Sequence, residues 1–133
     1  MLCLLTALLV ASTAAIADEP SPAAKAEIQA LLDDLGSSPC EFYRNGTWYK
    51  GADAKAHLNT KYEYLLKRDK VGSTEEFIDR AATRSSMSGE AYQVRCPDQA
   101  PVPSATWLIN ELLQIRKKQA PAIPRDPRIG PTK

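Results

Sequence analysis

The amino-acid sequence predicts an α+β fold, in which a small antiparallel sheet, made of a hairpin plus one strand, packs against about four helices in a single domain. Two observations carry this prediction. Several segments have apolar residues at helical spacing, and an Asn-Gly pair lies between two arms rich in β-forming residues. The resulting order of helix, hairpin, helix, helix, strand and helix is typical of an α+β layer architecture.

The first seventeen residues are interpreted as a secretory signal peptide. They carry no charged side chain, Leu2 to Val10 form an apolar run, and Ala15-Ile16-Ala17 is a small-residue cleavage signal. An uncleaved membrane anchor is the alternative, but a transmembrane helix needs about 20 apolar residues. We therefore expect cleavage after Ala17 and a periplasmic or secreted mature protein.

The first predicted helix covers residues 23–36, and the stretch SSPC ends it. Gly36 is expected to adopt the left-handed conformation of a C-cap. The apolar residues at helical spacing are Ala24, Ile28, Leu31, Leu32 and Leu35.

A β-hairpin is expected in residues 40–50, which read CEFYRNGTWYK. Asn45-Gly46 is typical of a type I′ turn, because both central residues of that turn need positive φ. Alternation along the strand puts Phe42 and Arg44 on one face and Tyr43 on the other. Phe42 is purely apolar, so it is the residue of this arm that we expect to be buried.

The second predicted helix covers residues 52–68, and the third begins at Ser73. Ser73 and Glu76 form the Ser-x-x-Glu pattern of a capping box. The apolar faces expected to be buried are Ala54, Leu58, Tyr62, Leu65 and Leu66 in the second helix and Phe77, Ile78, Ala81 and Ala82 in the third.

A turn over residues 83–89 leads to a predicted strand, residues 90–96. After a proline-rich connection, Ser104 is expected to cap the last helix, residues 105–118. The core stripe of that helix is Leu108, Leu112 and Ile115, with Trp107 at its edge.

Two cysteines, Cys40 and Cys96, remain once the leader is removed. An even count in an exported chain suggests a disulfide, and two buried free thiols are the alternative. The bond would close a loop of about 57 residues, for which chain entropy gives about 4 kcal/mol. It would also bring the last strand beside the hairpin.

The mature chain is expected to divide into a globular domain, residues 18–118, and a tail, residues 119–133. The tail contains four prolines and lacks an apolar stripe, so we expect it to be disordered and dispensable for folding. Residues 116–133 carry 6 basic and 1 acidic residue, whereas residues 18–115 carry 11 basic and 15 acidic residues. A weak contact of the basic tail with an anionic envelope surface is one hypothesis, and a solvated tail without a role is the other.

The sequence lacks the patterns of several site classes. One histidine and two paired cysteines do not make a usual zinc site, and there is no calcium-binding or phosphate-binding loop motif. No basic face of the kind found in nucleic-acid binders is present. We therefore expect no metal and no cofactor.

A few residues are candidates for a site. His57 and Lys61 share one strip of the second helix, where His57 is either a base with a pKa lowered by Lys61 or a boundary residue hydrogen-bonded to the hairpin. Ser85, Ser86 and Ser88 are either nucleophile candidates for that base or ordinary turn residues. Arg44 could bind an anion or pair with an acidic residue of the body, and an ordinary solvated arginine at the hairpin tip is the alternative.

A family resemblance is carried by three segments, residues 42–62, 73–94 and 107–116, and it covers most of residues 25–116. These segments resemble the family of small exported bacterial proteins typified by the enterobacterial protein YfeK, a domain of unknown function. The resemblance implies a bacterial envelope protein and no particular activity. It singles out one set of residues as candidate ligand-binding residues: Arg44, His57, Lys61, Ser86, Ser88 and Tyr92.

These observations favour a non-enzymatic binding or interaction module of the bacterial envelope, with an envelope protein or a small ligand as its partner. The sequence contains no complete catalytic constellation. The alternative is a small hydrolase-like enzyme that uses His57 with a nearby serine. The two hypotheses differ in whether a serine lies within hydrogen-bond reach of His57.

Overall fold

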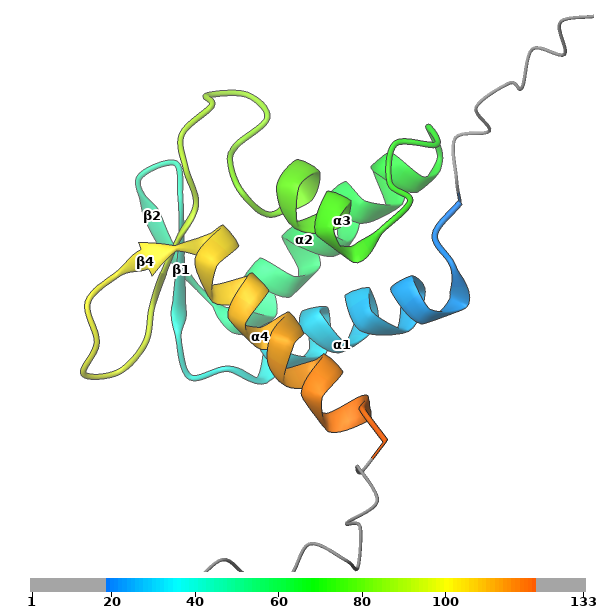
Figure 1. Cartoon of the computed structure of the whole chain (residues 1–133). Coiled ribbons are helices and arrows are strands. Elements are labelled where there is room, and N and C mark those ends of the chain that lie inside the picture. The colour runs from blue at the N-terminus through cyan, green and yellow to red at the C-terminus, as the bar shows by residue number, and fades with distance from the viewer. Residues whose placement is uncertain (1–18, 122–133) are drawn as a thin grey trace, which may run out of the picture.

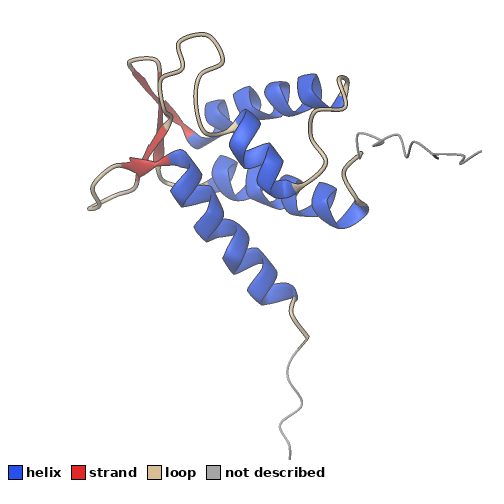
Figure 2. Cartoon of the chain, turned by 45° about the horizontal axis from the view of Figure 1, so that its top comes forward, coloured by secondary structure: helices blue, strands red, loops and turns tan. Residues whose placement is uncertain are grey.

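In the computed structural model, which describes residues 19–121, four helices and four strands follow one another as one α+β domain. In chain order they are α1 (Pro22–Ser37), β1 (Glu41–Arg44), β2 (Thr47–Lys50), α2 (Gly51–Leu66), α3 (Thr74–Ala81), β3 (Gln93–Arg95), β4 (Val102–Pro103) and α4 (Ser104–Gln119). The helices gather on one side of the sheet (Figure 1), and Figure 2 shows the strands together at one end of the helices. The predicted fold class is confirmed.

The antiparallel sheet has the strand order β2-β1-β3-β4, so the hairpin and the later strands form one layer. Asn45 and Gly46 have φ values of 48° and 87°, which confirms the predicted turn. Strand β4 was not predicted, because a two-residue strand that ends in Pro103 carries no alternating pattern and proline is disfavoured inside strands.

The core lies between the helices and the inner face of the sheet. Helix α2 packs against β1 and β2, helix α4 packs against β3 and β4, and α1 contacts the other three helices. All predicted apolar residues of α1 are buried, as are those of the third helix and the core stripe of α4. Phe42 is also buried, as predicted, with its ring 5.5 Å from that of Trp107. In α2 only Leu58 of the predicted stripe is fully buried.

The predicted C-cap role of Gly36 is wrong. Helix α1 continues through Gly36 to Ser37, and Gly36 does not have a positive φ. The place that a Cβ on Gly36 would take lies beside the side chain of Lys55 in α2. Gly36 therefore lies within α1 beside α2, and it does not end the helix.

The predicted helix starts are confirmed for the third helix and wrong in detail for the last. Ser73 Oγ accepts the backbone N–H of Glu76 at 3.1 Å, as a capping box requires, although the Glu76 carboxylate accepts from Gly72 and not from Ser73. Ser104 is the first residue of α4 and does not cap it with its side chain. Its buried backbone N–H donates instead to the carbonyl of Tyr92 at 2.9 Å.

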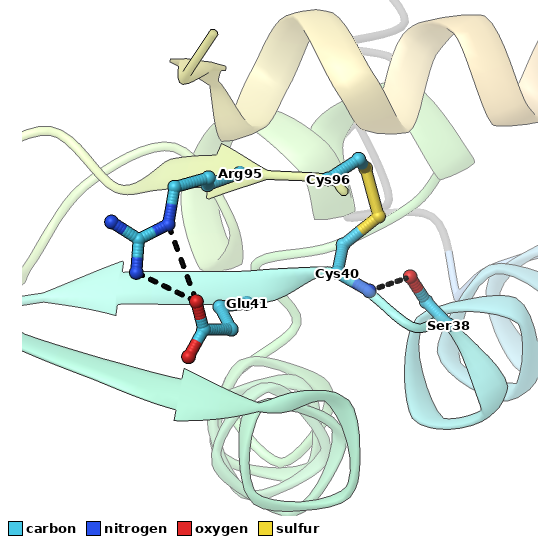
Figure 3. Close-up of a disulfide and its surroundings, with 5 residues drawn as sticks. All are labelled: Ser38, Cys40, Glu41, Arg95 and Cys96. Atoms are coloured by element: carbon cyan, nitrogen blue, oxygen red, sulfur yellow. Dashed lines mark hydrogen bonds and ion pairs between the residues drawn. A yellow bond between two sulfur atoms is a disulfide. The ribbon is translucent and has the colours of Figure 1, made fainter. Parts of the chain in front are cut away.

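The disulfide between Cys40 and Cys96 is present, with a Cα–Cα distance of 4.1 Å. Figure 3 shows that it joins the residue before β1 to the residue after β3. Beside it, Arg95 donates to the Glu41 carboxylate at 2.6 Å, and these two residues are direct partners in the β1–β3 pairing. The disulfide thus fixes the register between β1 and β3, where the chain returns to the hairpin.

The predicted boundaries of the signal peptide and of the C-terminal tail lie mostly outside the described residues. The predicted signal peptide and residues 122–133 of the predicted tail lie outside the described residues. Gln119, assigned to the tail, belongs to α4.

Arg116, counted with the basic end, donates to Glu27 of α1 at 2.9 Å and to Glu75 of α3 at 2.6 Å, so its charge stabilises the packing of three helices. No helix in the described range is long and apolar enough to cross a membrane.

Candidate functional site

A cleft of about 330 Å³ opens between the inner face of the sheet and helices α1 and α2. Its lining comes mainly from the hairpin and α2, with single residues from α1 and α4 and two residues at the start of β3. Most of its wall is apolar or aromatic, and a carboxylate, an imidazole and a guanidinium interrupt that wall: Asp53, His57 and Arg44. The complete lining is Leu35, Phe42, Tyr43, Arg44, Tyr49, Asp53, Ala54, His57, Leu58, Tyr92, Gln93 and Ser104.

Four of the six predicted ligand-binding residues form one hydrogen-bonded cluster beside this cleft. Arg44 Nη1 donates to His57 Nδ1 at 3.0 Å, and His57 Nε2 lies 3.1 Å from the hydroxyl of Tyr92. Lys61 Nζ donates to the same hydroxyl at 3.3 Å and to the carbonyl of Arg84 at 3.0 Å. We call Arg44, His57, Lys61 and Tyr92 the polar cluster. Lys61 belongs to the polar cluster through its bond to the Tyr92 hydroxyl, and it does not line the cleft.

Secondary structure explains why these residues meet. His57 and Lys61 are four residues apart on α2 and therefore lie on the same side of the helix. Arg44 shares the inner face of β1 with Phe42, as strand alternation predicts. Tyr92 is held just before β3, because its N–H donates to the carbonyl of Thr83 at 3.0 Å and its own carbonyl accepts from Ser104.

The partners of His57 determine its tautomer. A guanidinium group has only donors, so His57 Nδ1 must be the acceptor of the bond from Arg44. The proton of the neutral ring is then on Nε2, which donates to the Tyr92 hydroxyl. A protonated ring would place a second N–H against Arg44, so this geometry requires neutral His57.

The charges and burial of the polar cluster favour the same protonation states. Burial, and then the positive charges of Arg44 and Lys61, lower the pKa of His57. Burial and the charge of Arg44 also lower the pKa of Lys61. Burial raises the pKa of Tyr92, and the charge of Arg44 opposes this only in part. At neutral pH the cluster therefore holds a neutral imidazole and a phenol that keeps its proton.

Ser86 and Ser88, the other two predicted residues, are not brought to His57. Ser88 Oγ donates to Asn45 Oδ1 at 2.7 Å, and Asn45 Nδ2 donates to Ser85 Oγ at 3.2 Å. These bonds fasten the turn after α3 to the hairpin tip. Ser86 is exposed. In residues 19–121 no serine hydroxyl hydrogen-bonds to His57, and Ser85 and Ser88 act as turn residues. Ligand binding by Ser86 and Ser88 stays a prediction.

The two alternatives considered for Arg44 and His57 are now distinguishable. His57 is hydrogen-bonded to the hairpin through Arg44, as the boundary alternative predicted. Arg44 does not pair with the acidic body, since none of the ion pairs within the described range includes it. Its guanidinium instead lies 4.9 Å from the ring centre of Tyr49. The sequence analysis missed Tyr49, Asp53 and Gln93 as cleft residues, because only the fold brings them to this wall.

We expect the free energy of unfolding to decrease as the pH falls from about 7 to about 5, and His57→Gln to remove most of this dependence. The chain contains a single histidine. Its pKa is lowered in the folded state, so in this window the unfolded chain binds the proton that the folded protein excludes. One proton gives a slope of at most about 1.4 kcal/mol per pH unit, and the partial exposure of the ring keeps the effect smaller.

Urea denaturation of both proteins at several pH values measures this effect. The groups facing the ring are Arg44, Lys61 and Tyr92, with Asp53 one turn earlier on α2. The carboxylates with lowered pKa values lose their contribution only below about pH 4.5, outside the window. Parallel curves for wild type and His57→Gln would show that His57 titrates alike in both states.

Comparisons of the sequence with known proteins identify the family of the chain. The chain is 33% identical over 69 residues to the uncharacterized protein YfeK of Salmonella typhimurium, and the match covers 51% of this chain and 56% of that protein. The aligned part is thus little more than half the length of that relative. No solved structure matches the chain. A family model described as a family of unknown function, DUF5329, matches residues 22–116, which is most of the chain and includes every element from α1 into α4. The chain therefore belongs to this family of unknown function, as the resemblance to YfeK predicted.

Proposed function

We propose that this protein is a non-enzymatic binding module of the bacterial envelope that holds a small ligand in the cleft between the sheet and α2. The observation that carries the proposal is the combination of an apolar cleft with a polar cluster at its wall. Small-molecule sites in proteins are commonly concave and mostly apolar, with a few convergent polar groups that set orientation. Its volume, about 330 Å³, lies within the range of such sites.

The geometry does not favour the hydrolase alternative. A serine nucleophile needs a base within hydrogen-bond reach. Both ring nitrogens of His57 are engaged, one by Arg44 and one by Tyr92. To accept a proton from a serine, His57 would have to give up the bond from Arg44. Ser85 and Ser88 are hydrogen-bonded to Asn45 at the hairpin tip instead.

The envelope location rests on two features of the chain. Residues 1–17 have the composition of a cleaved leader, and the disulfide suits an oxidising compartment. Fractionation of cells that express the full chain tests it, with the mass of the recovered protein as readout. We expect a periplasmic protein that begins at Asp18 and gains the mass of two hydrogens on reduction. Recovery of the uncleaved chain in the cytoplasm would contradict this part of the proposal.

Filling the cleft tests ligand binding without removing any polar group. Ala54 is half-buried on α2 and lines the cleft. We expect Ala54→Trp to abolish the binding of small molecules that wild type binds, because the indole occupies the space. The measurement is protein-observed NMR with a panel of anionic, neutral and cationic small molecules.

Ala56→Trp is the matched control, since Ala56 is exposed on the same helix and does not line the cleft. It should bind the same panel members as wild type. If no panel member shifts the signals of cleft residues in wild type, or if Ala54→Trp binds as well as Ala56→Trp, the proposed function is wrong.

A further inference from the structure

We propose that the ligand of this cleft is a small amphiphilic anion, whose oxyanion group binds Arg44 and Tyr92 and whose apolar body lies against the half-buried Tyr49 and Ala54. This inference rests on the proposed function and adds the chemical class of the ligand. A carboxylate and a phosphate ester share the required chemistry, and both are included in the test.

Arg44 supplies donors that no group within residues 19–121 uses. A guanidinium has five N–H donors in a fixed planar arrangement, which suits two oxygens of one anion. In the described part of the chain, a single side-chain hydrogen bond involves Arg44, the bond from Nη1 to His57. The side chain lines the cleft and is half-buried there. The remaining donors are thus available to an acceptor in the cleft.

Tyr92 supplies a second free donor. Its hydroxyl oxygen accepts from His57 Nε2 and from Lys61 Nζ, so both of these contacts use the oxygen as an acceptor. The hydroxyl proton has no acceptor among residues 19–121. The residue is only 7% exposed and lines the cleft. A hydroxyl that accepts twice, belongs to a buried residue and donates to no described residue is suited to a ligand oxygen.

The local charge also favours an anion. Arg44 and Lys61 are the two cations of the polar cluster, and neither forms an ion pair within the described residues. Asp53 is the one carboxylate in the cleft lining, and it is exposed at the rim. Neutral His57 adds no charge, but its bond from Arg44 fixes the guanidinium. A bound anion would supply the negative charge that no described carboxylate brings to Arg44 or Lys61.

The rest of the wall requires an apolar body. Leu35, Phe42 and Leu58 are each at least nine-tenths buried and belong to the hydrophobic core that borders the cleft. Tyr49 adds an aromatic ring next to Arg44. Tyr49 and Ala54 also line the cleft and are only half-buried, so an aryl or alkyl group would cover apolar surface that a small hydrated inorganic ion would leave in water.

Affinities for four matched probes test the inference, measured by NMR titration of the mature full chain. The probes are phenylacetate, phenyl phosphate, neutral phenylacetamide and cationic phenethylamine. We expect at least one anion to bind about tenfold more tightly than phenylacetamide. Tyr92→Phe should lower the affinity for that anion about tenfold and change the affinity for phenylacetamide by less than about twofold. The stronger of the two anions identifies the oxyanion group.

Two further variants keep the test decisive. Tyr62→Phe removes a phenolic oxygen from α2 outside the cleft and should bind like wild type. Arg44→Gln repeats the loss of anion affinity through the other donor, and it carries the test if Tyr92→Phe does not fold. Equal binding of phenylacetate, phenyl phosphate and phenylacetamide, or preferred binding of phenethylamine, would overturn the anion assignment. Either result would leave the cleft as a ligand site, so it is distinct from a failure of the proposed function.

Discussion

Replacing both Cys40 and Cys96 by alanine is expected to lower the free energy of unfolding by about 4 kcal/mol. The bond joins residues 56 apart in the sequence, and removing it frees that whole loop in the unfolded chain. A domain of this size has a total stability of about 5–15 kcal/mol, so the double variant should be close to unfolding at 37 °C. The same loss should appear when the wild-type protein is fully reduced.

The measurement is urea denaturation of the oxidised protein, the reduced protein and the double variant. Glu41→Gln with Arg95→Gln is the matched control, since this pair lies next to the disulfide and ties the same two strands. Both side chains are more than a third exposed, so removing the ion pair should cost less than about 1 kcal/mol. A loss below about 1 kcal/mol for the cysteine variant would mean that the reduced chain keeps the loop closed in its unfolded state.

The correct parts of the predicted fold depend on local signals. Asn45-Gly46 specifies its turn through positive φ at two adjacent residues, and Ser73 caps α3 by accepting the backbone N–H three residues further on. The buried faces of α1 and α4 follow from helical spacing within one segment. Such signals act over a few residues and do not need the rest of the fold.

The wrong parts depend on contacts between distant segments. Strand β4 exists because β3 lies next to it, and two residues alone carry no pattern. Arg116 looked like one charge of a basic tail, but its partners Glu27 and Glu75 are 89 and 41 residues away in the sequence. A residue list cannot show which of many acidic side chains such an arginine meets.

The candidate site was predicted to a similar extent. Arg44 and His57 are 13 residues apart and Lys61 and Tyr92 are 31 apart, and the resemblance grouped them before any geometry was known. It also grouped Ser86 and Ser88, whose turn binds the hairpin tip and not the cleft. The resemblance groups residues but does not determine the direction of their side chains. The apolar residues of the cleft have the same sequence pattern as the core, so the sequence does not distinguish them.

Gly51→Ala is expected to lower the free energy of unfolding by about 2–3 kcal/mol, because the new methyl group would overlap backbone atoms. Gly51 begins α2, and a Cβ there would lie too close to the carbonyl oxygen of Leu35 and 3.3 Å from those of Gly36 and Ser38. Backbone at the end of a helix cannot rotate away as a side chain does. The start of α2 would have to move off the end of α1.

Gly36→Ala is the matched control on the other side of the same contact. Its Cβ would meet only the middle of the flexible Lys55 side chain, whose ammonium group is pulled toward Asp33 at the surface. Alanine is favoured over glycine inside a helix by about 1 kcal/mol, so this variant should be neutral or slightly more stable. Urea midpoints of the two variants, at an unchanged slope, measure the difference. Because Gly51 sets where α2 starts, its variant should also displace Ala54 and His57 from the sheet and weaken binding in the cleft, and Gly36→Ala should not. Equal stabilities of the two variants would show that the α1–α2 contact relaxes without cost, and Gly51 would then have no role in positioning the site.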